Sequence, residues 1–338
     1  MIRPPHLRIN GLLRLAIFMF SVEIHATSHV GRVRRGNEDN YLLLSITKNR
    51  AWTSKQESGE FVIESQTFDV DENGIVLAVS DGMGGALAGE VASKMAVESV
   101  SEKLLHEDIE ETLTPEAMDY NLIAKLYNAT VYANYLVHQQ GRSDSQYQGM
   151  GATFTGLGLT PRGIDIIQVG DSRAYLVRNE RIYQITKDQS LVQQLIDAQQ
   201  ISPEEAESHT LKNVILQALG AQNEIYPVSA RLAPCRDDVL LICSDGLSNK
   251  VSASSMQTHV SSNLDQLELA CAGLVKEANE NGGEDNITVV LARLVGDSLP
   301  VGEGDDVQLE LIDLGNIHDT ADQADDVDTQ EQDTAEIA

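Results

Sequence analysis

Short segments rich in Val, Ile, Leu and Tyr recur along most of the chain, each bounded by turn-forming residues. Helical periodicity is confined to two groups, at about 84–138 and 188–281. Because the strands follow one another while the helices come in groups, the pattern predicts antiparallel sheets covered by helices rather than a doubly wound βαβ fold. The predicted strands are 16–30, 41–46, 75–80, 153–159, 164–169, 173–178, 181–185, 239–243 and 287–295.

Four helical segments can be placed from their apolar spacing and start signals. One follows the glycines at 84–85, one has an apolar stripe over 122–136, and one over 267–278 ends at Gly282. A short helix pair is predicted between 190 and 209, since Ser202-Pro203-Glu204-Glu205 combines an N-cap, a first-turn proline and a capping-box glutamate.

The charge of the chain is strongly negative and unevenly distributed. Lys and Arg number 24 against 52 Asp and Glu, a net charge of −28, which would repel a nucleic-acid backbone. Residues 300–338 hold thirteen of the acids and no Lys or Arg. With apolar residues confined to 307–317, this segment is predicted to be a disordered acidic tail, which either solubilises the protein or docks a partner.

The N-terminal region is basic, and its apolar stretch at 15–22 is too short for a membrane span. A first strand is therefore favoured over an export signal, and Met19 is an alternative start. Three cysteines, at 235, 243 and 271, form no CxxC pair, which favours a reducing compartment and a cytoplasmic protein. The chain is accordingly divided into a basic extension at 1–22, a folded domain at 23–296 and the acidic tail at 297–338.

Acidic residues stand where predicted strands begin or end. Each Asp-Gly or Asp-Asn pair alone is typical of a turn. Together they suggest carboxylates gathered at one rim of a sheet, whose mutual repulsion a divalent cation would relieve. Because the eight histidines are scattered, an all-oxygen Mg²⁺ or Mn²⁺ site is favoured over a zinc site. The residues are Glu38, Asp39, Asp81, Asp171, Asp245 and Asp285.

Two such ions would activate a water for attack on phosphorus and neutralise the developing charge. Phosphoryl chemistry also needs a fixed cation, and Arg34, four residues before Glu38, offers a bidentate fork. Arg32 and Arg35 are alternatives at this stage, as is a basic loop without such a role.

Six motifs follow one another in a characteristic order over about 23–296. In this order and spacing they resemble the metal-dependent type 2C (PPM) protein serine/threonine phosphatases, in their bacterial form. The motifs are GRVRRGNED (31–39), SDGMGG (80–85), GMGAT (149–153), VGDSRAY (169–175), SDGL (244–247) and DNIT (285–288).

The resemblance implies an α+β fold, an αββα sandwich of two antiparallel sheets flanked by helix pairs. It implies two Mn²⁺ or Mg²⁺ ions bridged by Asp81. The carbonyl of Gly82 and the carboxylate of Glu38 would serve one ion, and Asp245 and Asp285 the other.

The same resemblance implies roles for three further residues. Arg34 would hold the substrate phosphate, Asp171 would help to hold a third, weaker ion, and Asp39 would support the ligands from behind. The stretch 187–220 resembles the flap beside the site, where substrate selectivity would lie.

By the resemblance, the substrates are phosphoserine and phosphothreonine proteins, opposed by a serine/threonine kinase. Two positions depart from the family pattern. Met83 stands, as a methionine does in bacterial relatives, where many eukaryotic members have histidine, so no general acid is assigned; in the flap, Gln189 follows Asp188 where relatives often have histidine. Two other classes stay open. One is a phosphatase-like binding module whose tail recruits a kinase or a forkhead-associated partner, and the other is a two-metal nuclease, which the net charge disfavours.

Overall fold

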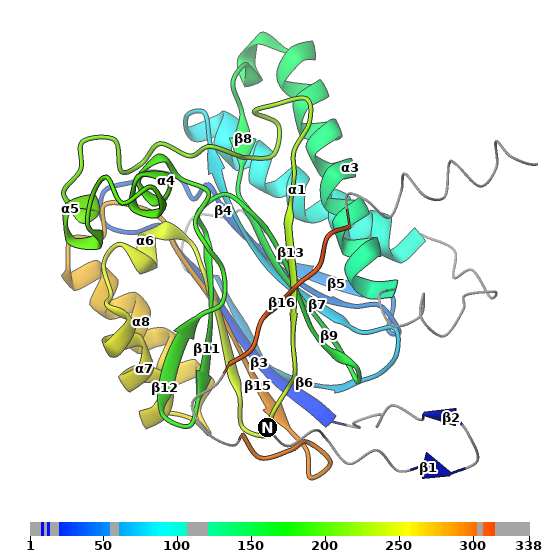
Figure 1. The fold of residues 1–338 in the computed structure, drawn as a ribbon. Helices are drawn as coiled ribbons and strands as arrows, with labels where there is room; N and C mark the ends of the chain where they lie inside the picture. The colour runs from blue at the N-terminus through cyan, green and yellow to red at the C-terminus, as the bar shows by residue number, and fades with distance from the viewer. Residues whose placement is uncertain are drawn as a thin grey trace, which may run out of the picture.

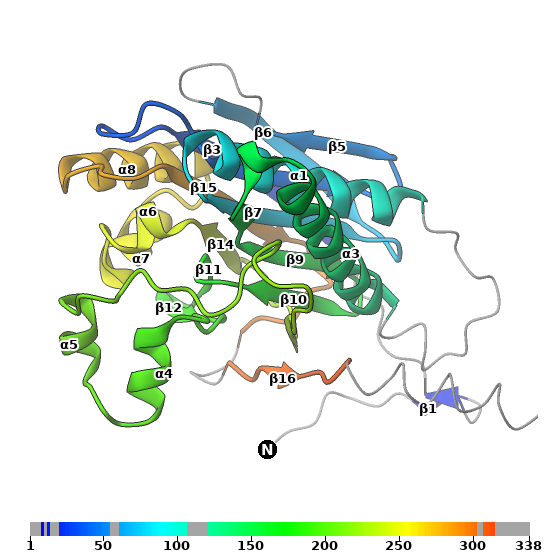
Figure 2. The ribbon, with the colours of Figure 1, turned by 90° about the horizontal axis from the view of Figure 1, so that it is seen from above.

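Two β-sheets pack face to face, and helices cover the outer face of each, in the computed structural model (Figure 1). The structure describes residues 8–9, 12–13, 20–54, 61–106, 121–302 and 307–314. Seen from above, one pair of helices lies on each side of the strands (Figure 2). The predicted α+β sandwich of αββα type is confirmed, and every described strand pairing is antiparallel.

The larger sheet has eight strands, with β7 and β9 near its centre. Along the sheet the order is β16 (Glu310–Leu311), β13 (Val228–Leu232), β10 (Gly163–Val169), β9 (Phe154–Thr160), β7 (Ile75–Met83), β4 (Asp39–Ser45) and β5 (Arg50–Thr53), and β8 (Gly151–Ala152) pairs with the end of β7.

The smaller sheet has six strands. Their order is β12 (Arg181–Gln184), β11 (Arg173–Arg178), β14 (Val239–Cys243), β15 (Ile287–Val295), β3 (Phe20–His29) and β6 (Phe61–Val70).

Alternation along the strands explains how both faces of each sheet are buried. On β7, Ile75, Leu77 and Val79 join the core between the sheets, while Val76 and Ala78 face the outer helices. Such strands are apolar at nearly every position, which is why they were visible in the sequence as continuous runs.

The outer helices cover the sheets in pairs. Against the larger sheet lie α1 (Ala86–His106) and α3 (Asn121–Ser143). Against the smaller sheet lie α7 (Ala253–Ser262) and α8 (Leu267–Glu280), with the short α6 (Asp245–Ser248) directly after β14. No helix in the described part of the chain is both long and apolar enough to cross a bilayer.

The predicted flap carries two short helices, α4 (Leu191–Asp197) and α5 (Pro203–Glu207), between β12 and β13. The capping box expected at Ser202 is present: Ser202 Oγ accepts from the Glu205 amide at 3.2 Å, and the Glu205 carboxylate accepts from the Ser202 amide at 2.7 Å. The flap projects from the sandwich beside α6 (Figure 1).

The two ends of the chain differ in part from expectation. The prediction of a disordered tail is wrong for residues 307–314, because β16 pairs with β13 and Leu314 is buried against the helix-covered face of the larger sheet. Residues 315–338 lie outside the described part. The predicted first strand is β3, which begins at Phe20, and the short β1 (Arg8–Ile9) and β2 (Leu12–Leu13) precede it. The division at 1–22, 23–296 and 297–338 is otherwise still a prediction.

Candidate functional site

A cavity of about 240 Å³ gathers the residues that the sequence singled out. Seven of the eight predicted site residues line it, and only Asp39 lies behind it. The predicted residues in its lining are Arg34, Glu38, Asp81, Gly82, Asp171, Asp245 and Asp285, and the others are Met83, Gly84, Gly85, Thr153, Asn213 and Ile215.

The carboxylates come together because the strands that precede or follow them end at the same place. Glu38 comes just before β4, Asp171 joins β10 to β11, and Asp285 comes just before β15. Asp245 is the first residue of α6, directly after β14. Asp81 was expected to follow its strand, but β7 does not end at Ser80: it continues through Asp81 to Met83.

Two glycines allow helix α1 to approach β7 at the cavity. A Cβ on Gly82 would collide with the carbonyl of Gly89, and a Cβ on Gly89 would collide with the Glu38 carboxylate. The Gly82 amide donates to the Glu38 carbonyl at 3.1 Å. The backbone of Gly82 and the side chain of Glu38 are therefore held side by side against the helix.

Asn286 fixes the loop that carries Arg34 and Glu38. Its side-chain carbonyl accepts from the Glu38 amide at 2.7 Å, and its side-chain amide donates to the carbonyls of Val30 and Gly36 at 2.9 and 3.0 Å. Asn286 is 2 % exposed and follows Asp285 directly, so one short segment positions acids from both sheets.

Asp39 joins the two sheets behind the cavity. Its Oδ2 accepts from Ser244 Oγ at 2.6 Å and from Thr288 Oγ1 at 2.7 Å. Burial raises the pKa of Asp39 to about 7, although these two hydrogen bonds act in the opposite direction. Its Oδ1 is buried and has no hydrogen-bond partner.

The acids that line the cavity are costly to keep ionised together. Desolvation raises the pKa of Asp81 well above its ordinary value, and the carboxylates of Asp39 and Asp245 raise it further. Desolvation likewise raises the pKa of Asp171 to about 7, with smaller contributions from Asp245 and Asp188. The pKa of Asp245 is also raised, by desolvation and then by Asp285. A cation in the cavity would relieve this repulsion.

Arg34 is the basic residue in the cavity lining. Its two terminal nitrogens donate to Glu38 Oε1 at 3.4 Å and to Asp285 Oδ2 at 2.8 Å. Its side chain is 45 % exposed, so the guanidinium lies at the mouth of the cavity between two of the acids. Of the three arginines that the sequence offered as a phosphate-binding cation, Arg34 is the one that lines the cavity with the acids.

The donor set fits a hard divalent ion. Every charged group in the cavity apart from Arg34 is a carboxylate, and Asp245 Oδ1 is buried without a hydrogen-bond partner. Across the described ranges, no three His, Cys, Asp or Glu side chains lie close enough to enclose an ion by themselves. An ion held here would therefore complete its coordination with backbone, water or phosphate oxygens.

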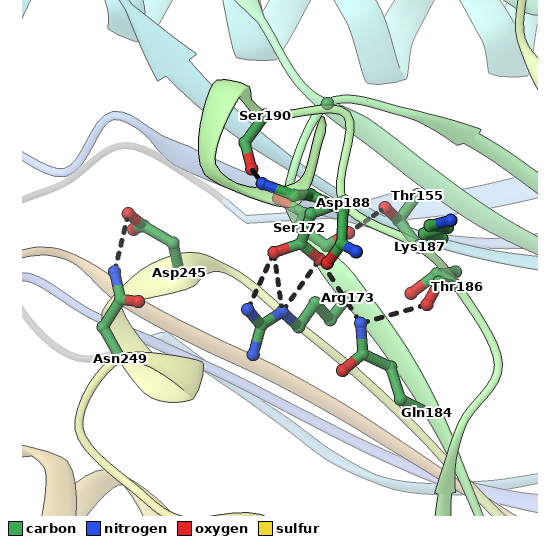
Figure 3. A network of polar contacts seen from close by, with 12 residues as sticks. Thr155, Ser172, Arg173, Gln184, Thr186, Lys187, Asp188, Ser190, Asp245 and Asn249 are labelled. Carbon is green, nitrogen blue, oxygen red and sulfur yellow. Dashed lines mark hydrogen bonds and ion pairs between the residues drawn. The ribbon is translucent and has the colours of Figure 1, made fainter. Parts of the chain in front are cut away.

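A second cavity, of about 550 Å³, adjoins the first and shares Asp171, Asn213 and Asp245 with it. One wall is formed by the flap helices, through Val192, Ile196, Pro203 and Ala206 among others, and the other by α6 and the residues after it. Figure 3 shows Asp245 across from the start of the flap, where Asp188 is paired with Arg173.

Sequence reasoning missed several residues that complete the site. Thr153 and Asn286 lay inside quoted motifs, so their positions could have been singled out beside the acids. Asn213 and Ile215, which reach the cavity from the end of the flap, carry no comparable signal.

Comparison with known proteins agrees with this geometry. The family model described as protein phosphatase 2C matches residues 54–274. The chain is 35 % identical over 269 residues to a protein named serine/threonine phosphatase stp from Listeria welshimeri, covering 77 % of this chain and 91 % of that protein. It is 36 % identical over 225 residues to protein phosphatase PhpP of Streptococcus pneumoniae, covering 65 % and 85 %.

Solved structures agree as well. The serine/threonine phosphatase PstP/Ppp of Mycobacterium tuberculosis superposes with a TM-score of 0.65 at 30 % identity, covering 82 % of this chain and all of that one. A structure of the PstP catalytic domain in complex with two manganese ions superposes with a TM-score of 0.62, also at 30 % identity and with the same coverage of both chains. The predicted resemblance is therefore confirmed, and the chain belongs to the protein phosphatase 2C family of serine/threonine phosphatases.

Proposed function

We propose that this phosphatase hydrolyses phosphoserine and phosphothreonine on protein substrates, in the cavity lined by Asp81, Asp245 and Asp285. The observation that carries the proposal is the convergence of carboxylates from both sheets on one cavity, where desolvation raises the pKa of Asp81, Asp171 and Asp245. Such a cluster of buried carboxylates destabilises the folded protein unless cations neutralise it.

The ions would be Mn²⁺ or Mg²⁺, held by Asp81 as the bridging carboxylate, with Glu38 and the Gly82 carbonyl on one side and Asp245 and Asp285 on the other. When bound, such ions lower the pKa of a coordinated water and neutralise charge on the phosphoryl group. That a related catalytic domain is described with two manganese ions supports two as the number. Asp171, which lines both cavities together with Asp245, would help to hold a third, weaker ion.

Arg34 would bind the substrate phosphate. It now donates to Glu38 and Asp285, and cations on these two carboxylates would leave its planar fork available for phosphate oxygens. Its partly exposed position at the cavity mouth suits a group that orients an incoming substrate.

We assign no side chain of the cavity lining as the general acid that protonates the leaving serine or threonine. Met83, at the position where many eukaryotic members of the family have histidine, lines the cavity and carries no transferable proton. The leaving group would then take its proton from water.

The larger cavity supports a protein substrate over a small phosphate ester. It continues from Asp171 and Asp245 between the flap and α6, and so offers room for the chain on one side of a phosphorylated residue. An opposing serine/threonine kinase, and a forkhead-associated partner for the acidic tail, belong to the same proposal. So does a cytoplasmic location, which the three buried, unpaired cysteines favour.

The test is hydrolysis of a phosphothreonine peptide with Mn²⁺, with and without EDTA, by the unaltered protein and by Asp245→Asn. We expect EDTA to abolish activity and Asp245→Asn to lower kcat/KM at least about 100-fold, since loss of a ligand removes several kcal/mol of charge stabilisation. Asp71→Asn is the matched control, because Asp71 only accepts from the turn amides of Asn73 and Gly74. EDTA-resistant hydrolysis, or equal activity of Asp245→Asn and Asp71→Asn, would contradict the proposal, and cleavage of a phosphodiester in preference to the peptide would favour a nuclease.

A further inference from the structure

Three residues at the start of the flap are hydrogen-bonded to β10, to β11 and to the turn between them that carries Asp171. We define the flap root as residues 187–190. The Lys187 amide donates to Gln168 Oε1 at 3.0 Å, and Asp188 accepts a fork from Arg173, with Nε at 2.9 Å and Nη2 at 2.7 Å (Figure 3). Ser190 caps α4 by accepting from the Gln193 amide at 3.3 Å.

Gln189 makes the closest link between the flap root and this turn. Its side-chain Oε1 accepts from the Gly170 amide at 2.7 Å, and its own amide donates to the Gly170 carbonyl at 2.9 Å. Its carbonyl accepts from the Leu216 amide at 2.7 Å, which brings in the returning end of the flap. One residue thus joins three segments: the turn before Asp171, the start of the flap and its end.

The backbone of Gly170 is held by its hydrogen bonds to Gln189, because glycine has no side chain that could pack. It is buried and has a φ of +100°, and a Cβ at this position would press on the side chain of Thr153. Its carbonyl accepts a second, longer bond from Gln168 Nε2 at 3.3 Å, whereas among the described residues its amide donates only to the Gln189 side chain. A buried amide without an acceptor is unfavourable, so the turn depends on the Gln189 side chain.

The same turn is connected to the centre of the site. Thr153 Oγ1 accepts from the Asp81 amide at 2.9 Å and lies 2.6 Å from Ser172 Oγ, on the far side of Asp171. The two residues that flank Asp171 are therefore each held by a hydrogen bond, Gly170 by the flap root and Ser172 by Thr153, which in turn accepts from the Asp81 amide.

We propose that Gln189 is a positioning residue for Asp171: it holds the turn at Gly170 against the flap root, so that the Asp171 carboxylate is presented to both cavities. This inference rests on the proposed function for its effect on ion binding, but the positioning itself requires neither ion nor substrate. Outer partners of ligand residues orient the ligand, and their loss typically weakens metal binding 10- to 100-fold.

Gln217 provides a matched control. Its Oε1 accepts from the Tyr226 amide at 2.7 Å, the same kind of bond at the same length, and it lines neither cavity. Gln189→Met and Gln217→Met each remove one side-chain acceptor while keeping side-chain length, and Gln217→Met also removes a longer bond, from Gln217 Nε2 to the Tyr226 carbonyl at 3.3 Å. Gln189→Glu keeps an oxygen acceptor for the Gly170 amide.

The first measurement is amide hydrogen exchange of the full-length, ion-free protein. Exchange at 168–172 should become faster in Gln189→Met, stay slow in Gln189→Glu, and be unchanged in Gln217→Met. Unchanged exchange in Gln189→Met, or loss of protection in Gln189→Glu as well, would overturn the inference.

The second measurement is Mn²⁺ binding by calorimetry. Gln189→Met should raise the Kd of the weakest-bound ion about 10-fold. Gln217→Met should bind this ion with the Kd of the unaltered protein. An equal rise in both variants, or in neither, would overturn the inference. Because the exchange measurement is independent of activity, failure of this inference is distinguishable from failure of the proposed function, which the peptide assay with EDTA and Asp245→Asn tests.

Discussion

At the scale of single residues, burial favours the protonated form of two aspartates in the ion-free protein. Desolvation places the pKa of both Asp39 and Asp171 at about 7 in the folded protein, far above the value of about 3.9 for an unfolded aspartate. Between these values the folded state binds more protons than the unfolded state, so stability falls as pH rises.

We therefore predict that, in EDTA, the free energy of unfolding decreases from pH 4.5 to pH 7, by at most about 1.4 kcal/mol per pH unit for each group. Urea unfolding at a series of pH values measures it. Saturating Mn²⁺ should reduce the slope, because an ion takes the place of the protons.

Asp39→Asn separates this effect from general repulsion in a chain of net charge −28. The variant should have a shallower slope than the unaltered protein under the same conditions. A stability that is constant or rises over this range in EDTA would contradict the account of these carboxylates.

The sequence was most informative at residues whose chemistry and local motif agree. The acids at strand ends could be assigned to one site because antiparallel strands bring distant ends together, and Asp81, Asp171 and Asp245 do line one cavity. Asn213 could not be predicted in this way: it reaches the cavity from the end of the flap, whose path across the molecule no local pattern encodes.

At the scale of elements, strands buried on both faces were predicted best. The bounds of β11, β14 and β15 agree with the sequence prediction. The prediction missed β6, where four consecutive polar residues (64–67) interrupt the apolar ones at the sheet edge, and β13, where Arg231 lies among apolar residues. Arg231 is tolerated there because its Nε donates to the buried Asp165 at 2.6 Å, a long-range pairing that sequence spacing cannot reveal.

The segment at 307–314 completes the larger sheet beside β13. Ile312 donates its amide to the Ser229 carbonyl at 2.9 Å, and Leu314 is 4 % exposed. The charge of this segment predicted disorder, but Val307, Ile312 and Leu314 pack against the apolar cores and dock it.

Removing residues 303–338 should therefore destabilise the protein by about 2 kcal/mol, chiefly through the lost burial of Leu314, and should expose the edge of β13 to pairing with other chains. Thermal unfolding and light scattering measure the two effects. Removal of 315–338 alone is the control and should leave both unchanged. If the longer deletion matched the shorter one, β16 would have no stabilising role.

At the scale of the whole molecule, the sandwich gathers acids from two sheets at one place. Asp81 belongs to the larger sheet, Asp245 and Asp285 flank strands of the smaller one, and Asp39 ties the sheets together through Ser244 and Thr288. The flap lies beside this place and lines the larger cavity, so under the proposed function substrate access and ion binding would meet at one end of the fold (Figure 1).

The most direct test of this account is the number of Mn²⁺ ions that the full-length protein binds, measured by calorimetry beside hydrolysis of a phosphothreonine peptide. We predict at least two ions for the unaltered protein, fewer for Asp81→Asn and Asp245→Asn, and activity that rises with ion occupancy. A protein that hydrolyses the peptide without binding Mn²⁺ or Mg²⁺, or that binds the same number of ions after both substitutions, would contradict it.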